Sequence, residues 1–233
     1  MKLKAITFTG VDDRTDPGAL KDIQKRYPLV EWGVLTARSW ADNGPRYPDP
    51  QTLGRFRGLG LNMSCHVCGS VARQIVRQGS WWHLVDVIGS GIELFSRCQL
   101  NVAGETAGNG TRSLRLMFNL DEVIIQQRGP AETQLYDAVL DHSRVSVLLD
   151  PSGGRGLVSD FVPLERPGVK VGYAGGLTPD NVAGKLRQLL EDSRVEDFWI
   201  DMESGVRTSD RFDLGKVEAA LRACYDVLST YSA

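Results

Sequence analysis

The chain has 233 residues, of which 42% are hydrophobic and 24% are charged, and its formal net charge is −2. This length suits a single domain over 1–233, and the composition supplies enough apolar surface for a full core. Lysine and arginine are spread along the chain, which argues against a nucleic-acid groove, and no apolar run approaches the ~20 residues of a membrane span.

Eight strand-like runs alternate with helical or helix-compatible stretches along the sequence. The strands are expected at 4–9, 30–36, 61–68, 98–102, 122–127, 145–150, 169–174 and 197–202. The helical stretches are expected at 17–27, 50–57, 70–78, 81–95, 112–120, 130–140, 157–164, 179–190 and 214–231. The last helix has the clearest pattern, because its apolar side chains recur at three- and four-residue steps and form one stripe. That stripe consists of Leu214, Val217, Leu221, Cys224, Leu228 and Tyr231.

This order of elements predicts the fold class. Strands that alternate with helices favour a parallel sheet, because parallel strands need crossover connections. Eight such units in ~230 residues fit a single (β/α)8 TIM barrel near the lower end of its size range. A doubly wound open sheet is the alternative, and it is disfavoured because no Gly-x-Gly-x-x-Gly follows the first strand.

The cysteines and the start of the chain bear on the compartment. The segment 1–4 runs straight into the first strand without the charged, apolar and small-residue layout of a signal peptide. The spacing of the cysteines is not that of a disulfide framework. We therefore expect a cytoplasmic protein. Cys65 and Cys68 would face opposite sides of a strand, and no second pair has metal-ligand spacing, so neither a metal nor another cofactor is expected.

Glycine-bearing turns follow the sixth, seventh and eighth expected strands, at 152–156, 174–177 and 203–205. Glycine lets the backbone approach a phosphate closely, and unpaired N–H groups at a helix start donate to it. In barrel enzymes the loops after strands seven and eight often form such a site. Taken singly, each turn needs its glycines only for tight strand-to-helix geometry. Three in series on these strands favour anion binding.

The same residues resemble the phosphoribosylanthranilate isomerase family. The resemblance runs in order along nearly the whole chain and is strongest in the last third, where the sequence reads LLD at 148–150, GGRG at 153–156, AGGLTPDNV at 174–182 and DMESGV at 201–206. The GPRY segment at 44–47 resembles the family's basic turn after strand two. The glycine turns are shared with other phosphate-binding barrels, so they identify the superfamily better than the reaction.

The resemblance implies an Amadori rearrangement of an aminoaldose phosphate into an aminoketose, a step of tryptophan biosynthesis. It also implies a small phosphorylated sugar ligand, and isomerases of this type occur as monomers and homodimers. Asp150 matches the family's general acid, which protonates the ring oxygen. The family's general base is a cysteine at the end of strand one, and this chain has Thr9 there. An unactivated hydroxyl is a poor base near neutral pH.

Strand three offers substitutes for the missing base. Strand alternation places His66 and Cys68 on one face, and His66 lies near the active rim if that face is the barrel interior. Histidine is the side chain best matched to proton transfer at neutral pH, whereas a thiol first needs a lowered pKa. The alternative for His66 is a histidine that is hydrogen-bonded to polar neighbours inside the barrel.

The remaining candidates are residues expected to hold the substrate or its phosphate: Arg46, Gly154, Arg155, Gly175, Gly176, Asp201, Glu203, Ser204 and Gly205. Polar side chains at strand ends usually serve a site, because barrel interiors are normally filled by branched apolar side chains. The alternative function is a non-catalytic phosphate-ligand-binding barrel, or a barrel with lyase or aldolase-type chemistry. The sixth strand carries no lysine near 148–150, which disfavours a Schiff-base aldolase.

Overall fold

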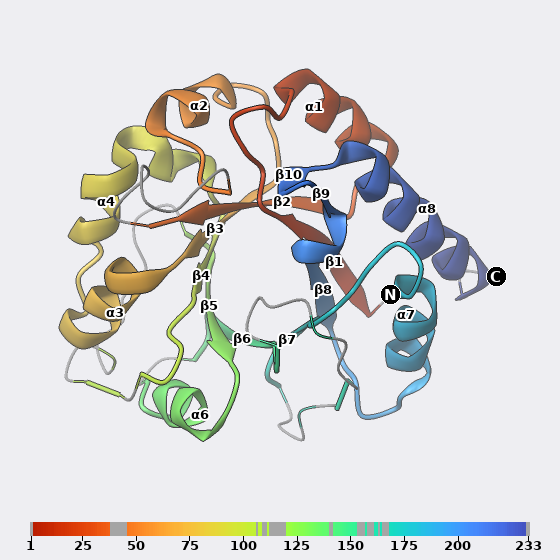
Figure 1. Cartoon of the computed structure of the whole chain (residues 1–233). Coiled ribbons are helices and arrows are strands. Elements are labelled where there is room, and N and C mark those ends of the chain that lie inside the picture. The colour runs from red at the N-terminus through yellow and green to blue at the C-terminus, as the bar shows by residue number, and fades with distance from the viewer. Residues whose placement is uncertain are drawn as a thin grey trace.

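The computed structural model describes residues 2–37, 46–105, 107–108, 111, 120–139, 142–152, 157, 161–162, 164 and 168–231. Its strands pair in sequence order, and β8 pairs with β1, so the sheet is a closed parallel barrel of eight strands. Figure 1 shows the barrel with helices arranged around its outside. The strands are β1 Leu3–Thr9, β2 Val30–Thr36, β3 Met63–Val67, β4 Arg97–Leu100, β5 Glu122–Gln127, β6 Val145–Leu149, β7 Val171–Ala174 and β8 Phe198–Met202. The predicted (β/α)8 barrel is confirmed.

The helices lie between these strands in the chain. They are α1 Pro17–Arg26, α2 Pro50–Arg55, α3 Gly69–Gln78, α4 Trp82–Ile88, α6 Pro130–Asp137, α7 Val182–Glu191 and α8 Leu214–Tyr231. Short 3-10 helices occur at η1 Gly89–Leu94 and η2 Ser204–Val206. Local chemistry sets several starts: Asp16 caps α1 ahead of Pro17, and Asp49 caps α2 ahead of Pro50. None of the helices in the described residues is long and apolar enough to cross a membrane.

The structure corrects several expected boundaries. The third strand begins at Met63 rather than at residue 61, and the seventh begins at Val171 rather than at 169. The helix after β7 begins at Val182 rather than at 179, because the Asn181 side chain closes a turn before it: its Oδ1 accepts from the Thr178 N–H, and its Nδ2 donates to the Gly176 carbonyl. Most of the expected helices at 112–120 and 157–164 lies outside the described residues.

A short hairpin, unexpected from the sequence, follows η2. It consists of β9 Arg207–Thr208 and β10 Arg211–Phe212, which pair antiparallel. The buried Arg207 guanidinium ties the hairpin to the loop after β1, because it donates to the Gly10 carbonyl and pairs with Asp12 at 3.4 Å. A Cβ on Gly10 would lie 2.5 Å from this guanidinium, and Gly10 has a φ of +106°, so both contact and backbone favour glycine there. Arg207 therefore has a structural role beside the site.

The alternation of side chains along the strands divides the buried residues into two groups, one between the sheet and the helices and one inside the barrel. Outward-facing strand residues pack under the helices in one large apolar core, to which Trp32, Cys65 and Cys98 belong. The residues that face into the barrel are mostly polar, and the apolar group among them is small: Ala5, Ile124, Leu148, Ala174 and Trp199. The chain thus keeps most of the branched apolar residues of its strands outside the barrel and its polar groups inside it.

The N-terminal end of the barrel is closed by a tryptophan and a set of charges. The Arg97 guanidinium stacks over the Trp199 ring at 4.4 Å and pairs with Glu31 at 3.4 Å and with Glu122 at 2.9 Å. The Glu31 carboxylate also accepts from the Thr7 hydroxyl at 2.9 Å. Glu31 therefore serves this end of the barrel and not the mouth.

Gly172 is the position on β7 that makes room for Trp199, since a Cβ there would overlap the indole ring. We expect Gly172→Ala to lower the free energy of unfolding by ~1–3 kcal/mol through overpacking. Gly184→Ala is the matched control, because it lies in α7 with open space around its Cβ and should raise stability by up to ~1 kcal/mol. Urea denaturation measures both changes. Equal effects would show that the Trp199 contact does not limit this position.

Candidate functional site

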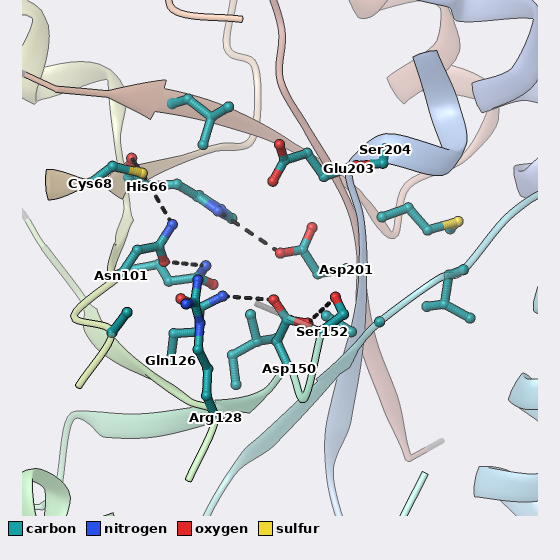
Figure 2. A pocket seen from close by; sticks show the side chains of 18 of the residues that line it. His66, Cys68, Asn101, Gln126, Arg128, Asp150, Ser152, Asp201, Glu203 and Ser204 are labelled. Carbon is teal, nitrogen blue, oxygen red and sulfur yellow. Dashed lines mark hydrogen bonds and ion pairs between the residues drawn. The ribbon is translucent and has the colours of Figure 1, made fainter. Parts of the chain in front are cut away.

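The carboxyl ends of the parallel strands meet around one cavity with a volume of about 320 Å³. Its walls carry His66 from β3, Asp150 after β6 and Asp201 from β8. Figure 2 shows these three side chains pointing into the same space. The cavity also borders the turns after β7 and β8, including Gly175, Gly176, Ser204 and Gly205. The predicted acid, the predicted base and two of the three predicted phosphate turns therefore lie around a single cavity.

The Asp150 carboxylate is held on both oxygens. Gln126 Nε2 donates to Oδ2 at 2.7 Å, and Ser152 Oγ donates to Oδ1 at 2.7 Å. Gln126 is at the end of the neighbouring strand β5, and Ser152 lies two residues beyond Asp150, so strand order and spacing bring all three together. With Asp150 only 3% exposed, these donors fix the direction of the carboxylate toward the cavity.

Thr9, His66 and Asp201 form a second buried cluster, from which His66 and Asp201 line the cavity. Thr9 Oγ1 donates to Asp201 Oδ1 at 2.7 Å and lies 3.4 Å from His66 Nδ1. The other ring nitrogen, Nε2, lies 3.1 Å from Ser64 Oγ. A Cβ on Gly33 of β2 would overlap Thr9 Oγ1, so glycine there lets the side chains from β1, β3 and β8 meet.

Burial determines where protons rest in this cluster. Desolvation and the positive charge of Arg97 lower the pKa of His66 to about 3, so the imidazole is neutral. Desolvation raises the pKa of Asp201 well above its usual range, against the lowering effect of the Thr9 hydrogen bond. Glu203, Asp150 and Glu31 raise it further by charge repulsion. The His66 Nδ1 and Asp201 Oδ2 atoms are 3.9 Å apart, and the carboxyl holds a proton in preference to the imidazole.

Cys68 follows the end of β3 and lines the cavity between Tyr47 and Asn101. The Asn101 Nδ2 atom donates to its sulfur at 3.2 Å, and the Tyr47 hydroxyl is hydrogen-bonded to the same thiol. Burial nevertheless raises the pKa of Cys68 to about 11. The thiol is therefore protonated near neutral pH and poorly suited to accept a proton from a ligand.

The glycine turns combine tight packing with free N–H groups. Gly175 and Gly176 have φ values of +118° and +64°, and the structure gives their N–H groups no hydrogen-bond partner among the described residues. The turn after β8 packs directly on this one, because a Cβ on Gly205 would overlap the Leu177 carbonyl. Gly205 is thus needed for contact between the two turns, whereas Gly175 and Gly176 line the cavity.

Arg46 and Glu203 form an ion pair at the rim. The Arg46 guanidinium donates to Glu203 at 2.7 Å and to Asp210 at 2.7 Å. Burial raises the pKa of Glu203, and the Arg46 pairing opposes that rise. The structure thus places Arg46 against the hairpin loop after β8. Gly154 and Arg155, together with Gly44 and Pro45, lie outside the described residues.

Several cavity residues were not predicted. Gln99 pairs with His66 across β3 and β4 and shares its inward face, so strand pairing was the available signal for Gln99. Ser152 hydrogen-bonds to Asp150, and its signal was the spacing of two residues between them. Arg73 and Arg128 also line the mouth, from the first turns of α3 and from the end of β5. Tyr47 belongs to the GPRY segment at 44–47, but its contact with Cys68 in the cavity was not predicted. Within the described ranges, no three His, Cys, Asp or Glu side chains are placed to hold a metal ion.

Comparison with known protein families finds no match for the chain. Among solved structures, N-(5'-phosphoribosyl)anthranilate isomerase from Pyrococcus furiosus aligns over 95% of this chain and 98% of that chain with a TM-score of 0.58 and 16% identity. The phosphoribosyl anthranilate isomerase from Thermococcus kodakaraensis aligns over the same shares, 95% and 98%, with a TM-score of 0.58 and 18% identity. A truncated 3-deoxy-D-arabino-heptulosonate 7-phosphate synthase from Thermotoga maritima aligns over 98% and 87% with a TM-score of 0.55 and 8% identity. These likenesses confirm the resemblance at the level of the fold.

The raised pKa of Cys68 gives a direct test of the cavity wall. Cys65, Cys98 and Cys224 are buried, so Cys68 is the thiol that reagents reach first among the cysteines. We expect alkylation by iodoacetamide to be slow at pH 7.5 and to rise about tenfold per pH unit toward pH 11, because only the thiolate reacts. Mass spectrometry of the labelled peptide measures the rate, and Cys68→Ser supplies the background. Fast labelling at pH 7.5 would contradict the protonated thiol.

Proposed function

We propose that this protein is an isomerase that converts a phosphorylated aldose derivative into the corresponding ketose, in an Amadori-type rearrangement. One observation carries the proposal: a fixed carboxylate, Asp150, lines the same cavity as His66 and Asp201 of the buried Thr9–His66–Asp201 cluster, and the glycine turns border that cavity. Such a rearrangement needs an acid for the ring oxygen and a base for the C2 proton on opposite sides of one sugar. It needs no further cofactor.

The phosphate is assigned to the turns after β7 and β8. The N–H groups of Gly175 and Gly176 and the nearby residues Ser204 and Gly205 border the cavity on this side. An anion bound there accepts hydrogen bonds from the backbone without needing a charged side chain. Asp150 follows β6, which neighbours β7, so a sugar whose phosphate occupies these turns extends across the mouth past the carboxylate.

Asp150 is the proposed acid. Its protonated form delivers a proton to the ring oxygen as the bond from that oxygen to C1 breaks, and the Gln126 and Ser152 hydrogen bonds keep the carboxyl group directed at the cavity. On the opposite wall, Thr9 does not replace the cysteine as a base, because its hydroxyl proton is donated to Asp201. The C2 proton is therefore assigned to the cluster around Thr9, in which the sequence favours His66.

A binding protein without turnover is the second candidate. It is favoured by the hydrogen-bonding geometry of His66, whose two ring nitrogens both face hydroxyl groups of the barrel wall. In that case the cavity binds a sugar phosphate and releases it unchanged. The two candidates share the phosphate site and differ in whether Asp150 is needed for more than binding.

We expect the chain to restore growth without tryptophan to a bacterial strain that lacks phosphoribosylanthranilate isomerase, and Asp150→Ala to abolish the rescue. Loss of a general acid costs ~10²–10⁴ in turnover, which is enough to remove growth support. The matched control is Asp180→Ala, a carboxylate outside the cavity after β7. Rescue by Asp150→Ala, or failure of the folded wild-type protein to rescue and to convert N-(5'-phosphoribosyl)anthranilate in vitro, would contradict this reaction.

The phosphate assignment has its own test. Gly176→Val should weaken binding of D-ribose 5-phosphate by tenfold or more in calorimetry, because the side chain blocks the backbone donors. Gly58→Val is the matched control: Gly58 has a similar φ of +71°, against +64° at Gly176, but nothing lies within 4 Å of its Cβ. It carries the same backbone strain away from the cavity and should leave the affinity unchanged. Equal losses in both variants would mean that strain, not the anion site, determines binding.

A further inference from the structure

The contacts of His66 and Asp201 distinguish their roles. Both ring nitrogens of His66 already face the wall, Nδ1 toward Thr9 at 3.4 Å and Nε2 toward Ser64 at 3.1 Å. Asp201 uses Oδ1 to accept from Thr9 at 2.7 Å, and within the described part of the chain the one polar contact of its Oδ2 is the His66 Nδ1 atom, at 3.9 Å. Figure 2 shows the Asp201 carboxylate directed at the His66 ring, on the same side of the view as Asp150.

We infer that the Asp201 carboxylate, through Oδ2, is the group that removes the C2 proton, and that Thr9 and His66 are positioning residues. This inference rests on the proposed isomerase function. It changes the assignment of the base from the imidazole to the carboxylate beside it. It also gives Thr9 a role, since the hydroxyl that stands in the place of the family's cysteine orients Asp201.

The step balances without a further reactant. Asp150 donates a proton to the ring oxygen, the bond from C1 to that oxygen breaks, and an iminium forms between C1 and the amine nitrogen. Asp201 Oδ2 then takes the proton from C2. The electrons of the C2–H bond form a C1=C2 double bond, and the C1=N pair returns to nitrogen. The resulting enol becomes the ketone when its O2 proton passes to Asp150 and Asp201 returns a proton to C1, so both carboxyl groups regain their starting state and substrate and product are isomers.

The surroundings of Asp201 suit a base of this kind. A carboxylate whose pKa is raised is a stronger base than an ordinary one, whereas an imidazole whose pKa is about 3 is a weak one. Charged neighbours act from several elements: Glu203 on the same strand end, Asp150 after β6 and Glu31 on β2 all raise the pKa of Asp201. The Thr9 hydrogen bond lowers the pKa of Asp201 and so favours the ionised form, which accepts a proton.

The first test needs no substrate. Nitrogen-15 NMR of the full chain, with His66→Gln used to assign the signal among the three histidines, reports the charge of His66. We expect His66 to remain neutral from pH 8 to pH 5. A cationic His66 at pH 6 would overturn the inference, because the proton would then rest on the imidazole beside an ionised Asp201.

The second test uses N-(5'-phosphoribosyl)anthranilate as the probe. Asp201→Asn should cost ~10²–10⁴ in kcat, while His66→Gln, which keeps hydrogen-bonding groups, should cost about tenfold or less. Thr9→Val should move the acid limb of the kcat/KM profile to higher pH, because it removes the hydrogen bond that lowers the pKa of Asp201, and Thr9→Ser should restore it. A merely structural Thr9 would reduce activity without moving that limb.

The outcomes separate the two proposals. Turnover in Asp201→Asn equal to the wild type, or a loss in His66→Gln as large as that expected for Asp201→Asn, overturns the assignment of Asp201 and leaves the isomerase function standing. A wild-type protein that neither converts the probe nor exchanges its C2 proton with deuterated solvent refutes the proposed function for this substrate, and the assignment of Asp201 falls with it.

Discussion

The pairing of β1 with β8 is the contact on which the candidate site depends. It joins the two ends of the sheet from Leu3 opposite Phe198 to Phe8 opposite Met202, with one register shift between Leu3 and Ala5, and it closes the barrel. Closure brings Thr9 within 2.7 Å of Asp201, although 192 residues separate them in the sequence. Without this pairing the cavity would be an open sheet edge. The Asp201 carboxylate would then lose both the Thr9 hydroxyl donor and the desolvation that raises its pKa.

Burying polar and charged groups inside a barrel costs free energy, and this fold compensates that cost differently at each level along the strands. At the N-terminal end, Arg97 is paired with two glutamates and stacked on Trp199, which keeps buried charge compensated. Two residues further along the strands, the neutral His66 ring lies beside the hydroxyl groups of Thr9 and Ser64. At the mouth, Asp150 and Asp201 face open space. Opposite charges are thus paired below the site, and two carboxyl groups line the cavity at the site, where a ligand reaches them.

The alternation of strands and helices, the apolar stripe of α8 and the positions of Asp150 and Gly175 were predictable, because they rest on local periodicity and on turn chemistry. Strand alternation also predicted that His66 faces the barrel interior, where it lines the cavity. The proton balance of the cluster was not predictable, since it depends on burial and on three strands meeting at Gly33. The Arg46 ion pairs and the β9–β10 hairpin likewise arise from long-range contacts that no local pattern encodes.

A crystal structure of the protein with D-ribose 5-phosphate tests the central claim most directly, that one cavity binds a phosphorylated sugar between the glycine turns and two opposed carboxylates. The account predicts the phosphate group within hydrogen-bonding distance of the Gly175 and Gly176 N–H groups, with the sugar lying between Asp150 and Asp201. Phosphate bound instead beside Arg73 and Arg128 on the opposite wall, or a sugar that contacts neither carboxylate, would contradict it.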